Sequence, residues 1–227
     1  MNREIEIVAP EKIEARSFEI IGEELNNKGI KIDKDKEFII KRAIHTTADF
    51  DYAYSLRFSD GVINIMASLI KKGCIIVTDT NMALSGINKT ELAKWGSKAI
   101  CFMADEEVAM EAKLRGVTRA TVSMERASKL EGQVIFAIGN APTALIRLRE
   151  EYDAKTFIPS LVIGVPVGFV NVEIAKEMIM ETDIPYIINE GRKGGSNVAA
   201  ALINAVLYEI ELTLSGVRIA EIVACIG

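Results

Sequence analysis

The chain lacks the residues on which several classes of metalloenzyme depend. Its 227 residues include one histidine, His45, and three cysteines, Cys74, Cys101 and Cys225, which are far apart in the sequence. Zinc sites built from Cys and His clusters and the H-E-x-x-H motif are therefore excluded, and we expect no metal bound by side chains. An odd number of scattered cysteines is typical of reduced thiols, so we expect a cytoplasmic protein.

Long apolar runs and an excess of positive charge are also absent. The most apolar stretch, 157–170, contains two prolines and two glycines and is shorter than the roughly 20 residues of a membrane-spanning helix. The charged residues Arg3, Glu4 and Glu6 are unlike the start of a signal peptide. A formal net charge of -5 argues against a nucleic-acid partner. We therefore expect a soluble protein that binds neither membranes nor nucleic acids.

The motifs of common nucleotide and hydrolase sites are missing as well. The sequence contains no G-x-G-x-x-G, no glycine followed by Lys and Ser or Thr, and no G-x-S-x-G. A dinucleotide fingerprint, a Walker A loop and the nucleophile elbow of the α/β-hydrolases are thus excluded.

Short runs rich in Val and Ile alternate with longer amphipathic segments. The predicted strands are Cys74–Thr78, Ala99–Phe102, Val134–Ile138, Leu161–Val165 and Tyr186–Asn189. The predicted helices between and after them are Lys89–Trp95, Asp105–Arg115, Ala120–Leu130, Thr143–Tyr152, Val172–Glu181 and Ser196–Ile210. Apolar runs without alternation are typical of parallel strands that are covered on both faces. The pattern predicts a doubly wound α/β fold with a mostly parallel sheet flanked by helices.

The N-terminal third has a different pattern. Three helices are expected there, at Glu11–Asn27, Asp33–Ala48 and Gly61–Lys72, with a short strand at Ser55–Phe58. No Pro/Ser-rich linker, charge block or internal repeat divides the chain. We therefore expect one domain over residues 1–227, with an N-terminal helical segment.

Ligands of open α/β sheets bind beyond the carboxyl ends of the strands, and five loops are expected there. They are Asp79–Gly86, Gly116–Arg119, Gly139–Thr143, Gly164–Phe169 and Glu190–Ser196. In the last loop, Gly195 and Ser196, a candidate N-cap, follow Arg192 and Lys193, and together they could bind a carboxylate or phosphate. An ordinary strand-to-helix turn explains the same residues equally well, and a purely structural explanation suffices for Gly139–Thr143.

His45 lies near the end of a predicted helix, on the side away from its apolar stripe. Two interpretations remain open at this point. The histidine is either a solvated residue at a helix end or a proton donor or acceptor, since histidine alone titrates near neutrality without perturbation.

Seven segments of the chain, in order, resemble the precorrin-8X methylmutase family of corrin biosynthesis. They are Ile13–Ile21 (IEARSFEII), Ile39–Asp51 (IIKRAIHTTADFD), Asp79–Lys89 (DTNMALSGINK), Gly116–Arg119 (GVTR), Phe136–Leu145 (FAIGNAPTAL), Gly164–Val170 (GVPVGFV) and Gly191–Ser196 (GRKGGS). The HTTADFD and NMALSGINK variants are similar to the cobalt-dependent, anaerobic branch, although Asn81 replaces a threonine. The chain from Glu209 to Gly227 departs from the family pattern and is expected to be a C-terminal extension.

The resemblance implies an isomerase that moves a methyl group from C-11 to C-12 of a corrinoid. The product is cobyrinate in the cobalt branch and hydrogenobyrinate in the metal-free branch. Such an enzyme requires no cofactor, because any cobalt arrives inside the substrate, and the family is homodimeric with substrate near the subunit interface. Two alternatives stay open: a corrinoid-binding carrier without activity, and an unrelated α/β protein that binds a phosphorylated metabolite at 194–196.

The family's catalytic histidine corresponds to His45, which would protonate or hydrogen-bond the ring-C region. The expected substrate-binding residues are Ser17, Arg42, Asp79, Thr80, Arg119, Arg192, Gly195 and Ser196. Among them, Arg119 is expected to follow a strand end. Asp79 and Thr80 are expected to orient His45 or to accept a hydrogen bond from an arginine.

Overall fold

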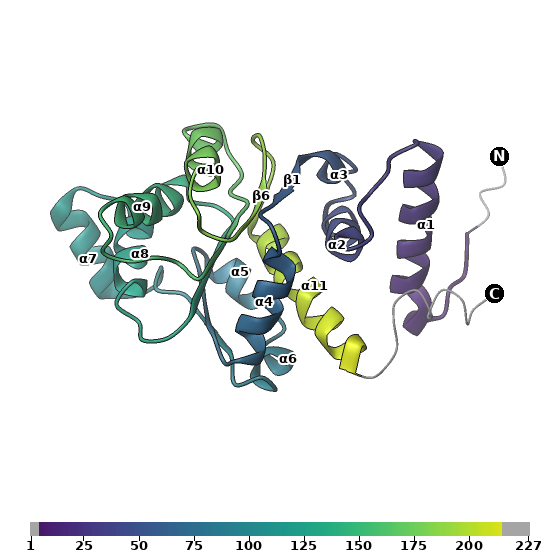
Figure 1. Cartoon of the computed structure of the whole chain (residues 1–227), viewed down its shortest axis with the longest axis horizontal. Coiled ribbons are helices and arrows are strands. Elements are labelled where there is room, and N and C mark those ends of the chain that lie inside the picture. The colour runs from purple at the N-terminus through teal and green to yellow at the C-terminus, as the bar shows by residue number, and fades with distance from the viewer. Residues whose placement is uncertain (1–4, 215–227) are drawn as a thin grey trace.

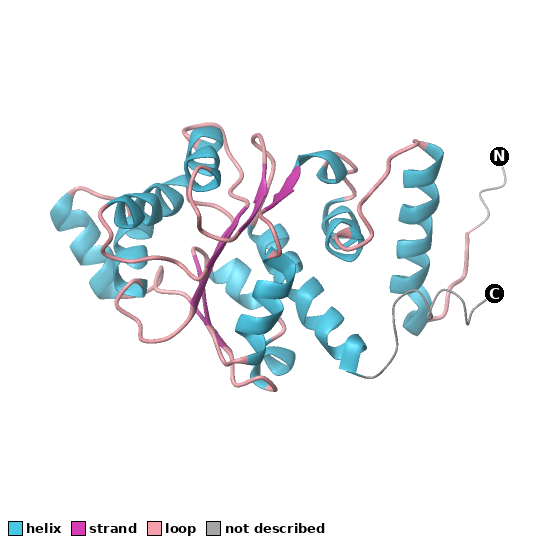
Figure 2. Ribbon diagram, in the orientation of Figure 1, coloured by secondary structure: helices cyan, strands magenta, loops and turns pink. Residues whose placement is uncertain are grey.

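A six-stranded sheet runs through the middle of the protein and carries helices on both faces (Figures 1 and 2). The computed structural model describes residues 5–214. The strands are β1 (Leu56–Phe58), β2 (Ile75–Thr78), β3 (Lys98–Ile100), β4 (Val134–Ile138), β5 (Leu161–Gly164) and β6 (Tyr186–Asn189), in the order β1-β6-β5-β4-β2-β3. Strands β2 to β6 pair in parallel and β1 pairs antiparallel with β6, which confirms the expected mostly parallel sheet.

The helices divide between the two faces of the sheet. Those that share a hydrophobic cluster with one face are α1 (Ile13–Asn27), α2 (Glu37–Thr47), α4 (Val62–Lys71) and α11 (Ser196–Leu214). The opposite face is covered by α8 (Arg119–Ala127), α9 (Pro142–Asp153) and α10 (Val172–Met180), and α7 (Glu106–Arg115) packs on α8. In Figure 1, α1 lies at one end of the molecule and α7 near the other. The fold is therefore doubly wound, with the predicted N-terminal helical segment.

Strand β4 shows why the sequence lacks polar alternation. Ile135 and Ala137 belong to the cluster with α2 and α11, whereas Val134, Phe136 and Ile138 belong to the cluster with α8, α9 and α10. All five side chains are buried, because each face of a central parallel strand meets a layer of helices.

A 3₁₀ helix, η1 (Pro10–Lys12), and three short α-helices complete the element order. The α-helices are α3 (Tyr52–Ser55), α5 (Asn81–Gly86) and α6 (Lys89–Ala93), of which α3 and α5 were not expected. The segment 79–86 was expected to be a loop, but Thr80 accepts a hydrogen bond from the N–H of Ala83 and so caps a helix directly after β2. Ser55 belongs to α3 rather than to the strand. Residues 209–214 of the expected extension continue α11, and 215–227 lie outside the described residues.

The chain reverses its direction across the sheet between β2 and β4. It passes from β2 to β3 on one side and then returns to β4 on the other side of β2, after which β5 and β6 follow outward. The loops that leave β2 and β4 therefore diverge, and this is the position where open α/β sheets bind their ligands.

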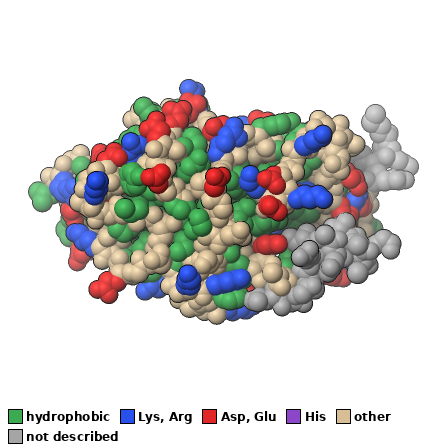
Figure 3. Space-filling view, in the orientation of Figure 1, with side chains coloured by type: hydrophobic (Ala, Val, Ile, Leu, Met, Phe, Trp, Pro, Cys, Tyr) green, Lys and Arg blue, Asp and Glu red, His purple; other side chains and the backbone are tan. Residues whose placement is uncertain are grey.

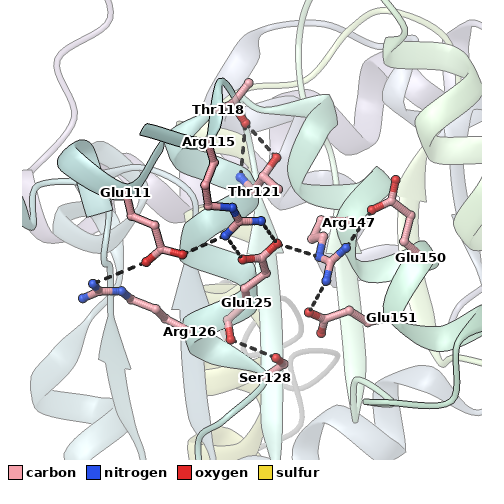
Figure 4. A network of polar contacts seen from close by, with 10 residues as sticks. All are labelled: Glu111, Arg115, Thr118, Thr121, Glu125, Arg126, Ser128, Arg147, Glu150 and Glu151. Atoms are coloured by element: carbon pink, nitrogen blue, oxygen red, sulfur yellow. Dashed lines mark hydrogen bonds and ion pairs between the residues drawn. The ribbon is translucent and has the colours of Figure 1, made fainter. Parts of the chain in front are cut away.

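A network of ion pairs joins the helices α7, α8 and α9 (Figure 4). Glu125 of α8 binds the guanidinium of Arg115 through both carboxylate oxygens and also lies 3.2 Å from Nε of Arg147 on α9. These pairs lower the pKa of Glu125, chiefly through the hydrogen bonds from Arg115. Elsewhere on the face in Figure 3, acidic and basic side chains are interspersed. Glu125 is thus the residue that joins the three helices.

We predict that Glu125→Gln lowers the free energy of unfolding by about 1–2 kcal/mol near neutral pH, because a charge-assisted bidentate pair is lost. The folded-state pKa of Glu125 lies below its ordinary value of 4.5, so its contribution is present above that value and is lost as the pH falls through the folded pKa. Urea unfolding of wild type and variant should therefore converge in acid. Exposed Glu131 provides the control as Glu131→Gln; a difference that stays constant with pH would contradict the prediction.

Candidate active site

Asp79 connects the loops that follow β2 and β4 at the reversal point of the sheet. Its buried carboxylate accepts hydrogen bonds from the N–H groups of Gly139 at 2.9 Å, Asn140 at 2.8 Å and Ala141 at 2.6 Å. Burial raises the pKa of Asp79, and the three N–H donors oppose that rise. The three donors lie in the loop after β4, so Asp79 joins the two loops. Because they occupy both of its oxygens, Asp79 does not take the expected role of orienting His45 or pairing with an arginine.

The first turn of α11 packs directly against the β4 loop. A Cβ atom on Gly139 would lie 2.6 Å from Cα of Ser196, so only glycine permits this approach. The hydroxyl of Ser196 lies 2.7 Å from that of Thr80, which links the loop after β2 to α11. Ser196 is the first residue of α11 and not its N-cap, since Gly195 precedes the helix there. Thr80, Gly195 and Ser196 are thus brought together.

Gly194 and Gly195 bring the loop after β6 against the loop after β5. Their φ angles are +156° and +148°, and a Cβ on Gly194 would lie 2.0 Å from the carbonyl oxygen of Val165. The N–H of Gly195 donates to that same oxygen at 2.9 Å. This close approach explains why glycine is present at both positions. The loops after β2, β4, β5 and β6 together form one continuous edge at the carboxyl ends of the strands.

His45 is exposed on α2 and contacts one aromatic ring. Ile40 and Ile44 of the same helix are buried, which confirms the predicted orientation of the helix. The imidazole and the Phe18 ring of α1 have centroids 5.2 Å apart. The histidine is therefore packed on one side and open to a ligand elsewhere.

Arg42 lies between two aromatic rings rather than in open solvent. Its guanidinium carbon is 4.8 Å from the centre of the Phe18 ring and 5.2 Å from that of Tyr208, and it pairs with Glu14. Ser17 precedes Phe18 and donates its hydroxyl to the carbonyl oxygen of Ile13 at 2.9 Å. Phe18 and Tyr208 were not predicted from the sequence as site residues. The adjacency of Phe18 to Ser17 was the available signal for the first, and no local signal marks the second.

Lys193 links the turn after His45 to the loop after β6. Its ammonium lies 2.5 Å from Asp49 and 2.6 Å from Asp51, both of the HTTADFD segment. From the sequence, Lys193 was either part of an anion-binding loop or a solvated residue of an ordinary turn. In the folded chain it is neutralised by the two aspartates, which places the end of α2 beside the glycine-rich loop.

The remaining two arginines stay accessible. The side chain of Arg192 is 58% exposed, with Nε 3.0 Å from Glu173 and the guanidinium carbon 5.6 Å from the centre of the Phe169 ring. Arg119 is exposed at the first position of α8.

The expectation that Arg119 follows a strand is wrong, because 116–118 connect α7 to α8 before the chain enters β4. The hydroxyl of Thr118 is 2.9 Å from that of Thr143 in α9. This contact places Arg119 near the loop that follows β4.

Seven of the candidate residues thus form two groups. Ser17, Arg42 and His45 lie on α1 and α2, while Asp79, Thr80, Gly195 and Ser196 lie at the sheet edge. Tyr208, which contacts Arg42, is twelve residues after Ser196, or about 18 Å along α11 at 1.5 Å per residue. The arrangement suits a large ligand that contacts several elements.

Residues 5–214 contain neither a cluster of metal-binding side chains nor a membrane-spanning helix. No group of three or more His, Cys, Asp or Glu side chains in this part of the chain is placed to hold a metal ion. No helix within it is long and apolar enough to cross a membrane.

The comparisons with known proteins indicate one and the same family. The precorrin-8X methylmutase family model matches residues 12–209. The chain belongs to this family. It is 43% identical to the cobalt-precorrin-8 methylmutase of Salmonella typhimurium over 90% of this chain and 97% of that one, and 38% identical to the precorrin-8X methylmutase of Pseudomonas aeruginosa over 86% and 94%. The protein is therefore an isomerase of corrin biosynthesis that catalyses intramolecular methyl migration.

A solved structure supports the same assignment. The precorrin-8X methyl mutase of Thermus thermophilus superposes with a TM-score of 0.81 at 35% identity, covering 92% of this chain and 99% of that chain. The α/β architecture described above is therefore the architecture of the family.

We predict that Asp79→Asn lowers the free energy of unfolding by about 2–4 kcal/mol, because the new amide N–H₂ faces backbone donors and leaves at least one of them unpaired in the interior. Urea unfolding measures the change. Exposed Asp60, changed to Asn, is the matched control and should behave as wild type. Equal stability of the two variants would show that the three hydrogen bonds do not hold the loops.

Proposed function

We propose that the protein converts cobalt-precorrin-8 into cobyrinate in the cytoplasm by moving a methyl group from C-11 to C-12 of ring C. Four of the relatives at 38–43% identity carry the name cobalt-precorrin-8 methylmutase, which supports the cobalt-containing substrate. The HTTADFD segment around His45 supports the same branch. The metal-free substrate is the second candidate, because a relative at 38% identity is named precorrin-8X methylmutase.

The single observation that carries this proposal is the exposed position of His45 near the end of α2, because the turn that follows this helix is bound by Lys193 of the glycine-rich loop after β6. His45 donates a proton or a hydrogen bond to the ring-C region and so favours migration. A well-placed donor of this kind typically contributes ~10²–10⁴-fold to a rate. Phe18 packs against the imidazole and limits its rotation. The rest of the barrier reduction comes from holding the macrocycle in one orientation.

The substrate's carboxylates are bound by cations and helix N-termini around this site. Arg192 is an accessible cation, and the N–H groups in the first turn of α11, which begins at Ser196, attract a negative charge. Ser17, Arg42, Thr80 and Arg119 line the remainder, and Asp79 supports the loops from behind. The methyl shift is intramolecular, and the family resemblance implies that it proceeds without a cofactor, with cobalt entering within the macrocycle.

We predict that incubation with cobalt-precorrin-8 changes the visible absorption spectrum with time, because the rearrangement alters the conjugated chromophore. His45→Ala should abolish this change while substrate binding weakens far less. Parallel reactions with metal-free precorrin-8X identify the branch. A spectrum that shows binding without conversion in the wild type would indicate a carrier. Near-normal turnover by the variant would remove His45 from the mechanism.

We also propose that two copies of the chain associate through the apolar loop after β5. Val167, Phe169, Val170 and Ile174 expose between 47% and 82% of their surface within one short segment, beside Arg192. Contiguous exposed apolar side chains of this kind favour a protein interface. A dimer formed here buries them next to the proposed substrate site.

We predict that the wild type has a mass in solution of twice 24.9 kDa and that Val170→Glu shifts it toward the monomer, because a charge is placed in an apolar interface. Light scattering after size exclusion measures this. Leu114→Glu changes another exposed apolar residue, on α7, and should leave the dimer intact. A monomeric wild type, or an unaffected V170E dimer, would contradict the proposed interface.

A further inference from the structure

Lys176 is a buried cation that the proposed reaction does not use. It lies on α10, only 1% exposed, on the same side of the helix as the buried residues Val172, Ala175 and Ile179. No ion pair in the described part of the chain includes it. Its ammonium donates instead to the carbonyl oxygens of Gly191 at 2.7 Å and Lys193 at 2.9 Å. Figure 1 shows α10 beside the loop that leaves β6.

Keeping a charge in this position is costly. Burial lowers the pKa of Lys176 to about 8, because the surroundings disfavour the ammonium relative to water. An apolar side chain of similar size would pack on the same face of α10 without that cost. Packing alone therefore does not explain why a lysine occupies this position.

Every carbonyl group from Glu190 to Lys193 is bound by a donor of the protein. Asn189, itself fully buried, donates through Nδ2 to the oxygens of Glu190 at 3.1 Å and Lys193 at 2.8 Å. The oxygen of Arg192 accepts from the N–H of Gly168 at 3.1 Å. Together with the two hydrogen bonds from Lys176, these hydrogen bonds hold four successive carbonyl oxygens so that they point into the protein.

This orientation matters for an anion. Carbonyl oxygens carry partial negative charge and repel a carboxylate, whereas N–H groups and guanidinium groups attract it. A loop that is to bind carboxylates must therefore keep its oxygens away from the ligand. Lys176 supplies two of the five hydrogen bonds that achieve this.

We propose that Lys176 is the positioning residue of the substrate-binding loop, holding the carbonyl oxygens of Gly191 and Lys193 inward so that Arg192 and the start of α11 face the carboxylates of the substrate. The inference rests on the proposed function, because it takes the loop after β6 to bind substrate. Lys176 itself does not touch the ligand.

The test is Lys176→Met, which keeps a long unbranched side chain but has no donor. We expect KM for cobalt-precorrin-8, and Kd for cobyrinate, to rise about tenfold or more, as for the loss of one or two charge-assisted hydrogen bonds. The value of kcat should stay within about threefold, because His45 is untouched. Lys176→Arg retains a cation and N–H donors and should recover part of the affinity.

Ile179→Val is the matched control, since Ile179 is buried on the same helix and its side chain has no hydrogen-bond donor for the loop carbonyls. It should lower thermal stability without raising KM. Amide hydrogen exchange of residues 191–197 in the free protein gives an independent measurement, with faster exchange expected in Lys176→Met. If that variant does not fold, Lys176→Gln, which is too short to reach both carbonyl groups, replaces it with the same expected results.

An active wild type together with unchanged KM and unchanged exchange in the variant would overturn the role of Lys176. An equal rise of KM in Ile179→Val would overturn it as well, because general loosening of α10 would then explain the effect. A wild type that neither binds nor converts a corrinoid would refute the proposed function instead, and the exchange measurement would still decide whether Lys176 holds the loop.

Discussion

Close approach of backbone segments at the carboxyl edge of the sheet is the constraint on which the site depends. The loops after β2, β4, β5 and β6 lie in direct contact, which is possible only because Gly139 and Gly194 have no Cβ atom. Asp79 then joins two of these loops through three hydrogen bonds. A buried carboxylate that is fully bound in this way is rigid, and it holds the β4 loop where α11 begins. The start of α11 is therefore fixed before any ligand arrives.

Charged side chains divide into those that hold the fold and those that remain for a ligand. Lys193 is paired with Asp49 and Asp51, and Lys176 is bound to backbone oxygens, so both organise the loop after β6. Arg192 in the same loop stays accessible. A site built in this way needs little rearrangement on binding, because the cost of ordering the loop is met during folding.

The family motifs gain a physical meaning from these contacts. HTTADFD and GRKGGS are separated by about 140 residues in the chain, yet the lysine of one binds both aspartates of the other. DTNMALSG and GNAPT are joined through Asp79 in the same manner. Residues of these four motifs thus fix the positions of distant segments of the chain relative to one another.

The sequence by itself determined the strands, most helices, the two-faced burial of the sheet and the outward orientation of His45. Each of these follows from the local order of apolar and polar side chains, and the family resemblance supplied the reaction. Only the tertiary structure decided that Asp79 binds backbone N–H groups, that Arg42 lies between Phe18 and Tyr208, and that Arg119 follows a helix. The hydrogen-bonding partner of a polar side chain depends on which distant elements meet, and no local pattern records that.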